Sequence, residues 1–156
     1  MGILSLEKDR AVLVGVNQFK SDNGQDIDDS MSELEELAQT AGAQVVATTV
    51  QNRATIHPAY FIGKGKADEI AEFCKSNDVN LVIFNDELSG AQIRNLENMI
   101  GRSVVDRTTV ILDIFAQRAQ SREGQLQVEL AQLRYRLPRL IGLGKELSRQ
   151  RGGIGT

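Results

Sequence analysis

The chain has 156 residues, of which 41% are apolar and 25% are charged, and its formal net charge is −3. This composition is ordinary for a soluble globular protein that is long enough to form a real core. A single cysteine, Cys74, excludes an intramolecular disulfide, and the absence of Trp gives no sign of an aromatic cage or a carbohydrate site. No apolar run approaches the ~20 residues of a membrane span, and the first residues lack the features of a signal peptide.

The charge is unevenly distributed along the chain. Residues 1–101 hold 8 Lys/Arg and 16 Asp/Glu, a net charge of −8, whereas residues 102–156 hold 10 Lys/Arg and 5 Asp/Glu, a net charge of +5. A polyanion such as RNA would therefore meet the back half. The alternative is that these arginines simply occupy the solvent-exposed faces of helices.

The front of the chain predicts a strand, a loop and a helix. An apolar, β-branched run at 10–16 is typical of a strand buried on both faces. The acidic segment 20–29 is expected to be a loop, and it lacks the Gly and Glu positions of a calcium-binding EF-hand. Ser30 and Glu33 fit a capping box, which predicts a helix from Ser30 to about Thr40.

The next segment repeats this alternation. A second strand is predicted over 45–50, followed by an irregular stretch and a helix from Gly63 to about Ser76. A third strand is expected over 80–85. Ser89 caps the next helix, which Gly101 ends, and a short fourth strand follows at 103–105.

Strands that alternate with helices of this length predict βαβ units. We therefore expect an α/β fold with a four-stranded, mainly parallel sheet and helices on both faces. The crossover connections should be right-handed.

An antiparallel α-helical hairpin is predicted over 106–140. In its second half, leucines recur at spacings of four and three, at positions 126, 130, 133, 137 and 140. This seam is of the kind that packs one helix against another, and Thr108, Leu112, Phe115 and Ala119 repeat the rhythm upstream. The polar break 120–124 is expected to be an exposed tip. After Leu140 the pattern fades, which predicts a flexible, Gly-rich exit.

Catalytic and metal sites find little support in the sequence. Neither Gly65-Lys66 nor Gly144-Lys145 has the Gly and Ser/Thr positions of a P-loop, and no GxGxxG follows the first strand. One His and one Cys, far apart, cannot make a zinc site. We expect no catalytic residue and no metal ligand. A phosphate could be held at the start of a helix by Gly63, Lys64, Gly65 and Lys66, or these glycines could serve only a tight turn.

The hairpin carries the clearest functional signal, because arginine forks suit phosphate groups. The candidate RNA-binding residues are Arg118, Gln120, Ser121, Arg122, Gly124, Gln125, Arg134 and Arg136. A narrow hairpin with a basic tip can enter an RNA groove that a globular surface cannot. The alternative is that the arginines pair with Asp113, Glu123 and Glu129 on the hairpin itself.

Several segments resemble one protein family. They are ILDIFAQRA at 111–119, EGQLQVELAQL at 123–133, YFIGKGK at 60–66, LSGAQIRNLE at 88–97 and GGIGT at 152–156. Together they closely resemble the signature of the HflX family of ribosome-associated GTPases. The resemblance extends from about Val12 to the end of the chain.

The resemblance implies a cytoplasmic protein that binds the large ribosomal subunit and splits or rescues stalled ribosomes, especially under heat stress. It implies an α/β subdomain over 1–105, a helical hairpin over 106–141, and a Gly-rich linker over 142–156 that leads to a GTPase domain of the same chain. The tip, about Arg118 to Gln125, would contact ribosomal RNA near the peptidyl-transferase centre.

The same resemblance places GTP and Mg²⁺ in a P-loop domain beyond Thr156. We therefore expect no cofactor and no GTP hydrolysis for these 156 residues by the family mechanism. The alternative function is a nucleotide-binding or regulatory domain that restrains the adjacent GTPase domain.

Overall fold

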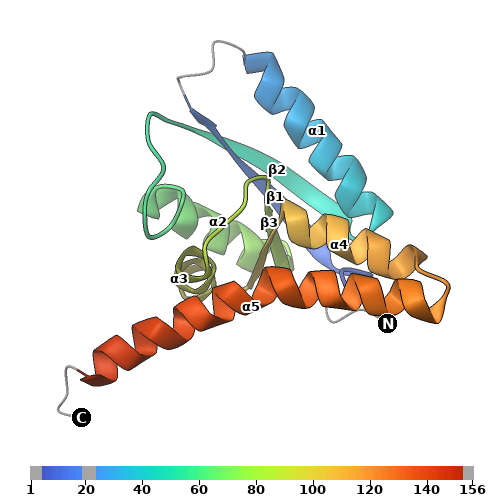
Figure 1. Cartoon of the computed structure of the whole chain (residues 1–156). Helices are drawn as coiled ribbons and strands as arrows, with labels where there is room; N and C mark the ends of the chain where they lie inside the picture. Colours follow the sequence, from blue (N-terminus) through green and yellow to red (C-terminus); the bar gives the residue numbers. More distant parts are fainter. Residues whose placement is uncertain (1–4, 19–23, 153–156) are drawn as a thin grey trace.

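The computed structural model describes residues 5–18 and 24–152, with the side chains of 5–18 and 26–140. Four parallel strands form one sheet in the order β2-β1-β3-β4, with helices on both sides (Figure 1). The elements are β1 Arg10–Gln18, α1 Gly24–Thr40, β2 Gln44–Arg53, α2 Lys64–Ser76, β3 Leu81–Phe84, α3 Gly90–Ile100, β4 Ser103–Asp106, α4 Arg107–Arg118 and α5 Arg122–Gly152. The predicted fold class is confirmed.

The core has two layers because side chains alternate along the strands. Val12 and Val14 face α2 and α3, where they pack with Ile70 and Leu96. On the other face, Leu13 packs in the cluster that holds the buried residues of α1 and α4. β1 and β3 are the central strands and are buried along most of their length, as their apolar sequences predict.

The start of α1 corrects the prediction for the front of the chain. The helix begins at Gly24, so most of the acidic segment expected to be a loop is helical. Ile27 packs with the core that contains Met31 and Leu34, so the apolar stripe of the helix begins before the predicted cap. Ser30 is therefore not an N-cap, and its hydroxyl instead accepts a hydrogen bond of 2.9 Å from Asn85 Nδ2.

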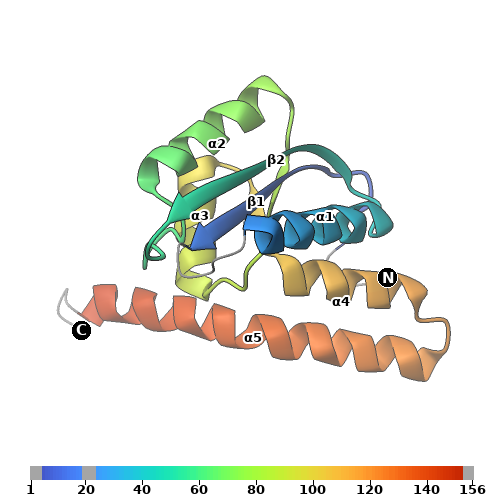
Figure 2. The same ribbon diagram turned by 90° about the horizontal axis from the view of Figure 1, so that it is seen from above.

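Helices α4 and α5 run antiparallel and side by side, as both views show (Figures 1 and 2). The predicted hairpin is thus present, but α5 does not end near Leu140. It continues to Gly152, so the expected flexible exit is wrong for 142–152, while 153–156 lie outside the described residues. The glycines at 142 and 144, which each cost about 1 kcal/mol in a helix interior, do not end α5.

The predicted packing of the leucine seam is wrong. All five leucines are about half exposed, from 47% at Leu130 to 55% at Leu126. The opposite side of α5 is the buried one, since Gln132 is 5% exposed and Tyr135 bonds to Asp106 at the start of α4. The regular spacing identified a continuous stripe correctly, but spacing does not say which side of a helix meets the rest of the protein.

Candidate functional site

The hairpin tip is built by a local cap. Residues 119–121 join α4 to α5, and Ser121 Oγ accepts a hydrogen bond of 3.0 Å from Gly124 N. Gln125 closes the turn, because its backbone N–H donates to Ser121 O and its side chain donates to Ala119 O. Three of the predicted RNA-binding residues, Ser121, Gly124 and Gln125, therefore shape the tip itself.

Two arginines flank this cap. Arg118 ends α4, Arg122 begins α5, and both are exposed, as is Gln120 between them. Across the residues that the structure describes, the side chain of neither arginine makes an ion pair or a hydrogen bond. Their guanidinium groups are thus available to an external anion.

Arg134 and Arg136 lie farther along α5 and are also exposed. The structure does not bring them to the tip, because they are more than two helical turns beyond Arg122. Within the described part of the chain, the alternative of pairing with hairpin carboxylates is not realised for either of them. The predicted RNA-binding residues thus form a compact tip group and a separate pair along the helix.

The base of the hairpin is held by a buried carboxylate that the sequence analysis did not single out. Asp106 is fully buried, and its Oδ1 accepts the Thr109 N–H, which caps α4. Its Oδ2 accepts hydrogen bonds from Leu88 N and from the Tyr135 hydroxyl of α5. Burial, together with the hydrogen bond to Asp106, raises the pKa of the Tyr135 hydroxyl. The Asp106 side chain therefore connects the sheet and both helices. In the sequence, an Asp immediately before a predicted helix is the signal that could have identified this cap.

Arg139 completes this anchor from α5. Its guanidinium lies 3.6 Å from the Tyr135 ring centroid, donates to Leu88 O at 3.0 Å, and pairs with Glu87 at 3.0 Å. Backbone contact is equally close, because a Cβ on Gly90 would lie 2.3 Å from Arg139 O. Only glycine at this position lets α5 rest directly on the start of α3.

A second polar clamp fixes α4 against the front of the chain. Asp113 is 1% exposed and accepts hydrogen bonds from Leu6 N and from Gln117 Nε2, at 3.3 and 2.8 Å. Gln117 also donates to Ala41 O at 2.7 Å. Burial raises the pKa of Asp113, while these hydrogen bonds oppose the rise. Asp113 and Gln117 are thus committed to structure and do not reach the tip.

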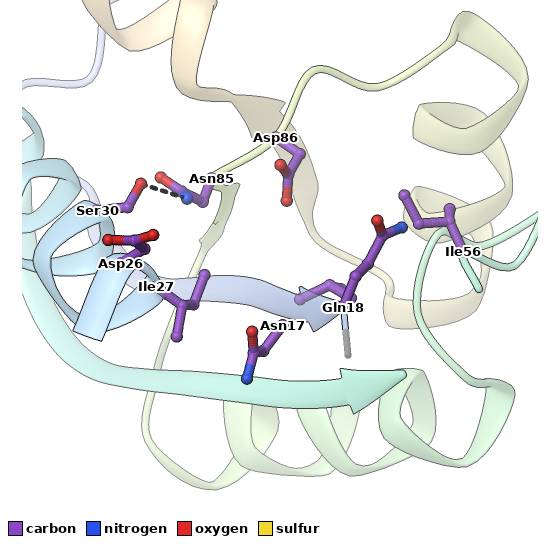
Figure 3. Close-up of a pocket in the computed structure, with 9 residues that line it drawn as sticks. Asn17, Gln18, Asp26, Ile27, Ser30, Ile56, Asn85 and Asp86 are labelled. Atoms are coloured by element: carbon purple, nitrogen blue, oxygen red, sulfur yellow. Dashed lines mark hydrogen bonds between the residues drawn. The ribbon is translucent and has the colours of Figure 1, made fainter. Parts of the chain in front are cut away.

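A pocket of about 440 Å³ opens at the carboxyl ends of β1 and β3 (Figure 3). This is the point where the strand order reverses, and α/β proteins commonly bind ligands there. The lining residues are Val16, Asn17, Gln18, Asp26, Ile27, Ser30, Ile56, Asn85 and Asp86. The sequence analysis missed this pocket because its residues come from four separated segments.

The chemistry of the pocket is acidic and amide-rich. Burial raises the pKa of Asp86, and the nearby Arg107 lowers it. Arg107 itself is occupied, because it donates to Asn85 Oδ1 at 2.7 Å and pairs with Glu33. Among the described residues of the lining there are carboxylates and no lysine or arginine, and this part of the pocket disfavours a phosphate group.

The possible phosphate site, Gly63, Lys64, Gly65 and Lys66, lies at the start of α2 as predicted. The Gly63 N–H already donates to Gln51 Oε1 at 2.9 Å, and Lys66 pairs with Glu69 at 3.4 Å. Lys64 and Gly65 are exposed. The site is therefore partly occupied by the protein's own groups, which leaves phosphate binding here a prediction.

Two further features of the described residues concern metals and membranes. They contain no group of three or more His, Cys, Asp or Glu side chains placed to hold a metal ion. None of the described helices combines the length and apolar character needed to cross a membrane.

Two family models match the chain. The model for the GTP-binding GTPase N-terminal region covers residues 28–116, and the model for the GTP-binding GTPase middle region covers 118–156. The boundary between them falls at the tip end of α4, close to the turn of the hairpin. The fold and these matches define the N-terminal and middle regions of a GTP-binding GTPase.

Individual relatives give the family. The GTPase HflX of Caldanaerobacter subterraneus subsp. tengcongensis is 53% identical over 153 residues, which is 98% of this chain and 35% of the relative. The GTPase HflX of Escherichia coli K12 is 48% identical over 147 residues, which is 94% of this chain and 34% of the relative. The chain belongs to the HflX family of GTPases and corresponds to the N-terminal region of its members. It spans about a third of the length of these relatives.

A solved structure supports the same fold. A GTP-binding protein from Sulfolobus solfataricus, in complex with GDP, aligns with a TM-score of 0.65 at 21% identity. The alignment covers 92% of this chain and 42% of that protein. At this level of identity, the similarity shows the fold alone.

Proposed function

We propose that this chain is the ribosome-binding region of a cytoplasmic HflX GTPase that splits or rescues stalled ribosomes under stress. The large ribosomal subunit would be its partner, and the hairpin tip would contact ribosomal RNA near the peptidyl-transferase centre. GTP and Mg²⁺ would be bound by the GTPase domain of the full-length protein.

The observation that carries this proposal is the contrast between the two ends of the hairpin. At the tip, the exposed guanidinium groups of Arg118 and Arg122 are free of intramolecular partners in the part of the chain described. At the base, Asp106, Tyr135 and Arg139 anchor the hairpin to the sheet and α3. Two free cations on a firmly held, narrow projection suit a phosphate-lined groove.

Co-sedimentation with large ribosomal subunits across a salt series tests the proposal. Binding should weaken steeply with salt, because each phosphate contact releases a counterion. Changing Arg118→Glu together with Arg122→Glu should abolish binding and leave the thermal melt nearly unchanged, since both side chains are exposed.

The matched control is Lys8→Glu with Lys75→Glu. These changes alter the net charge by the same amount at two exposed positions of the α/β part. The control should retain binding at moderate salt. Equal loss in both variants would show that overall charge, and not the tip, governs the interaction.

A nucleotide-binding or regulatory domain is the second candidate. The pocket at the strand-order reversal lies where α/β proteins commonly bind ligands, but the carboxylates of its described lining oppose the phosphates of a nucleotide. Isothermal titration with ATP and with GTP separates this possibility from RNA binding. Absence of heat at millimolar nucleotide would remove the nucleotide-binding form. A regulatory form predicts altered GTP turnover when this region is deleted from the full-length GTPase.

A further inference from the structure

The outer face of α5 carries an apolar stripe that nothing in the described chain covers. Its members are Leu126, Leu130, Leu133, Leu137 and Leu140, and each is about half exposed. In Figure 2, α4 and the sheet lie together on one side of α5, so its far side is free along its length. A contiguous stripe of this kind marks an interaction surface more often than isolated exposed leucines do.

The stripe has the spacing of a coiled-coil seam with charged flanks. In heptad terms the leucines alternate between a and d positions, Glu129 and Arg136 are g positions, and Arg134 is an e position. In the residues that the structure describes, the side chains of Glu129, Arg134 and Arg136 make no ion pair and no hydrogen bond. One edge of the stripe therefore offers a free carboxylate and a free guanidinium, seven residues apart.

We propose that α5 pairs with α5 of a second copy of this chain, antiparallel and related by a two-fold axis, through the leucine stripe. In this register Leu130 packs on the partner's Leu133, and Leu126 packs on the partner's Leu137. On the edge of the seam, Glu129 faces the partner's Arg136, and the symmetry repeats that ion pair. This charge complementarity points to a second copy of the chain as the partner. The same helix face supplies both the Glu129 and the Arg136 of the two ion pairs.

The antiparallel orientation is the one that the charges favour. A parallel pair would instead oppose Glu129 with the partner's Arg134, but it would bring two copies of the basic tip, Arg118 and Arg122, together. Antiparallel pairing keeps the tips at opposite ends and sets the two helix dipoles antiparallel, which is the favourable side-by-side arrangement. Because the stripe lies opposite the buried side of α5, pairing leaves the anchor at the hairpin base undisturbed.

Sedimentation equilibrium of the 156-residue chain, from micromolar to millimolar concentration, tests the proposal. We expect a reversible monomer–dimer equilibrium. Leu133→Gln should raise the dissociation constant by at least about 100-fold, because each dimer loses two buried leucines. The thermal melt of dilute samples should stay unchanged, since Leu133 is 52% exposed in the monomer. A wild-type chain that is monomeric throughout this range would overturn the proposal.

Charge reversal tests the register. Glu129→Arg should raise the dissociation constant by roughly tenfold through two new repulsions, and adding Arg136→Glu should restore it. The control Glu36→Arg makes the same change at an exposed position of α1 and should have no effect. Restoration by Arg134→Glu in place of Arg136→Glu would show parallel pairing and overturn the orientation. If the dimer forms but neither these charge reversals nor Leu133→Gln changes its dissociation constant, the interface lies elsewhere and the proposal is overturned.

Discussion

The two sides of the hairpin invert the usual distribution of polar and apolar residues. The inner side, against the sheet, buries Asp106, Asp113 and Gln132. The outer side exposes the leucine stripe to solvent. Buried polar groups are tolerated when they have partners: both carboxylate oxygens of Asp106 accept hydrogen bonds, and Oδ2 of Asp113 accepts two.

This difference separates the roles of the residues along the hairpin. The polar residues of the inner side determine where the hairpin projects from the sheet, because their hydrogen bonds have fixed directions. The outer side contributes little to the fold of one chain and is available for contacts. Asp113, which the sequence offered as an ion-pair partner for the hairpin arginines, therefore serves the fold, whereas the leucines that were expected to pack between helices are exposed.

The largest expected effect comes from breaking the anchor on the inner side. Asp106→Ala removes the cap of α4 and leaves the Leu88 N–H without its acceptor. We expect the free energy of unfolding to fall by about 3 kcal/mol, since a lost cap costs about 1 and an unsatisfied buried donor about 1–3 kcal/mol. Urea unfolding followed by circular dichroism measures the change.

The matched change on the outer side is Leu137→Ala. Leu137 is 54% exposed, so the free energy of unfolding of dilute samples should change by no more than about 0.5 kcal/mol. Tyr135→Phe, which removes one of the hydrogen bonds to Asp106, should fall between these two, at about 1 kcal/mol. A cost at Leu137 as large as that at Asp106 would contradict the division between the two sides.

A pair of glycines offers an intermediate effect. Gly90→Ala places a Cβ 2.3 Å from the Arg139 carbonyl, so α5 must shift, and we expect a loss of about 2 kcal/mol. Gly65→Ala meets no atom within 4 Å on an exposed helix and should instead stabilise by up to about 1 kcal/mol. Thermal melts of both variants compare them. Equal behaviour would mean that α5 does not rest on α3.

The smallest effect concerns the pH dependence of the inner side. Burial raises the pKa of Asp113 above 3.8, so the folded chain favours the protonated carboxyl and loses stability as the pH rises through the raised pKa. Asp113→Asn carries no charge, so its stability relative to the wild type should increase between pH 4 and pH 7. Urea unfolding at the two pH values measures this difference. Glu36→Gln, at an exposed position, is the control, and a difference independent of pH would contradict the expectation.

The sequence patterns were most reliable where one local rule acted alone. Ser89 caps α3 as predicted, here in a capping box with Gln92, and Gly101 ends the helix with a positive φ of 74°. The predicted start of α1 was wrong because Ile27 packs against a core formed by distant parts of the chain, which a local sequence pattern does not contain. Likewise, nothing near Asp106 in the sequence reveals that Tyr135 would be its partner, since the bond spans 29 residues.

By itself, the sequence determined the alternation of strands and helices, the parallel sheet, the hairpin and the family, because periodicity and short motifs are local properties. Only the tertiary structure decided which side of α5 is buried. A helix with leucines on one side and Gln132, Tyr135 and Arg139 on the other would be expected to bury its leucines. Here the polar side is buried because Asp106, Leu88 and Glu87, from other elements, supply its hydrogen bonds. Those partners come together only when the sheet has formed.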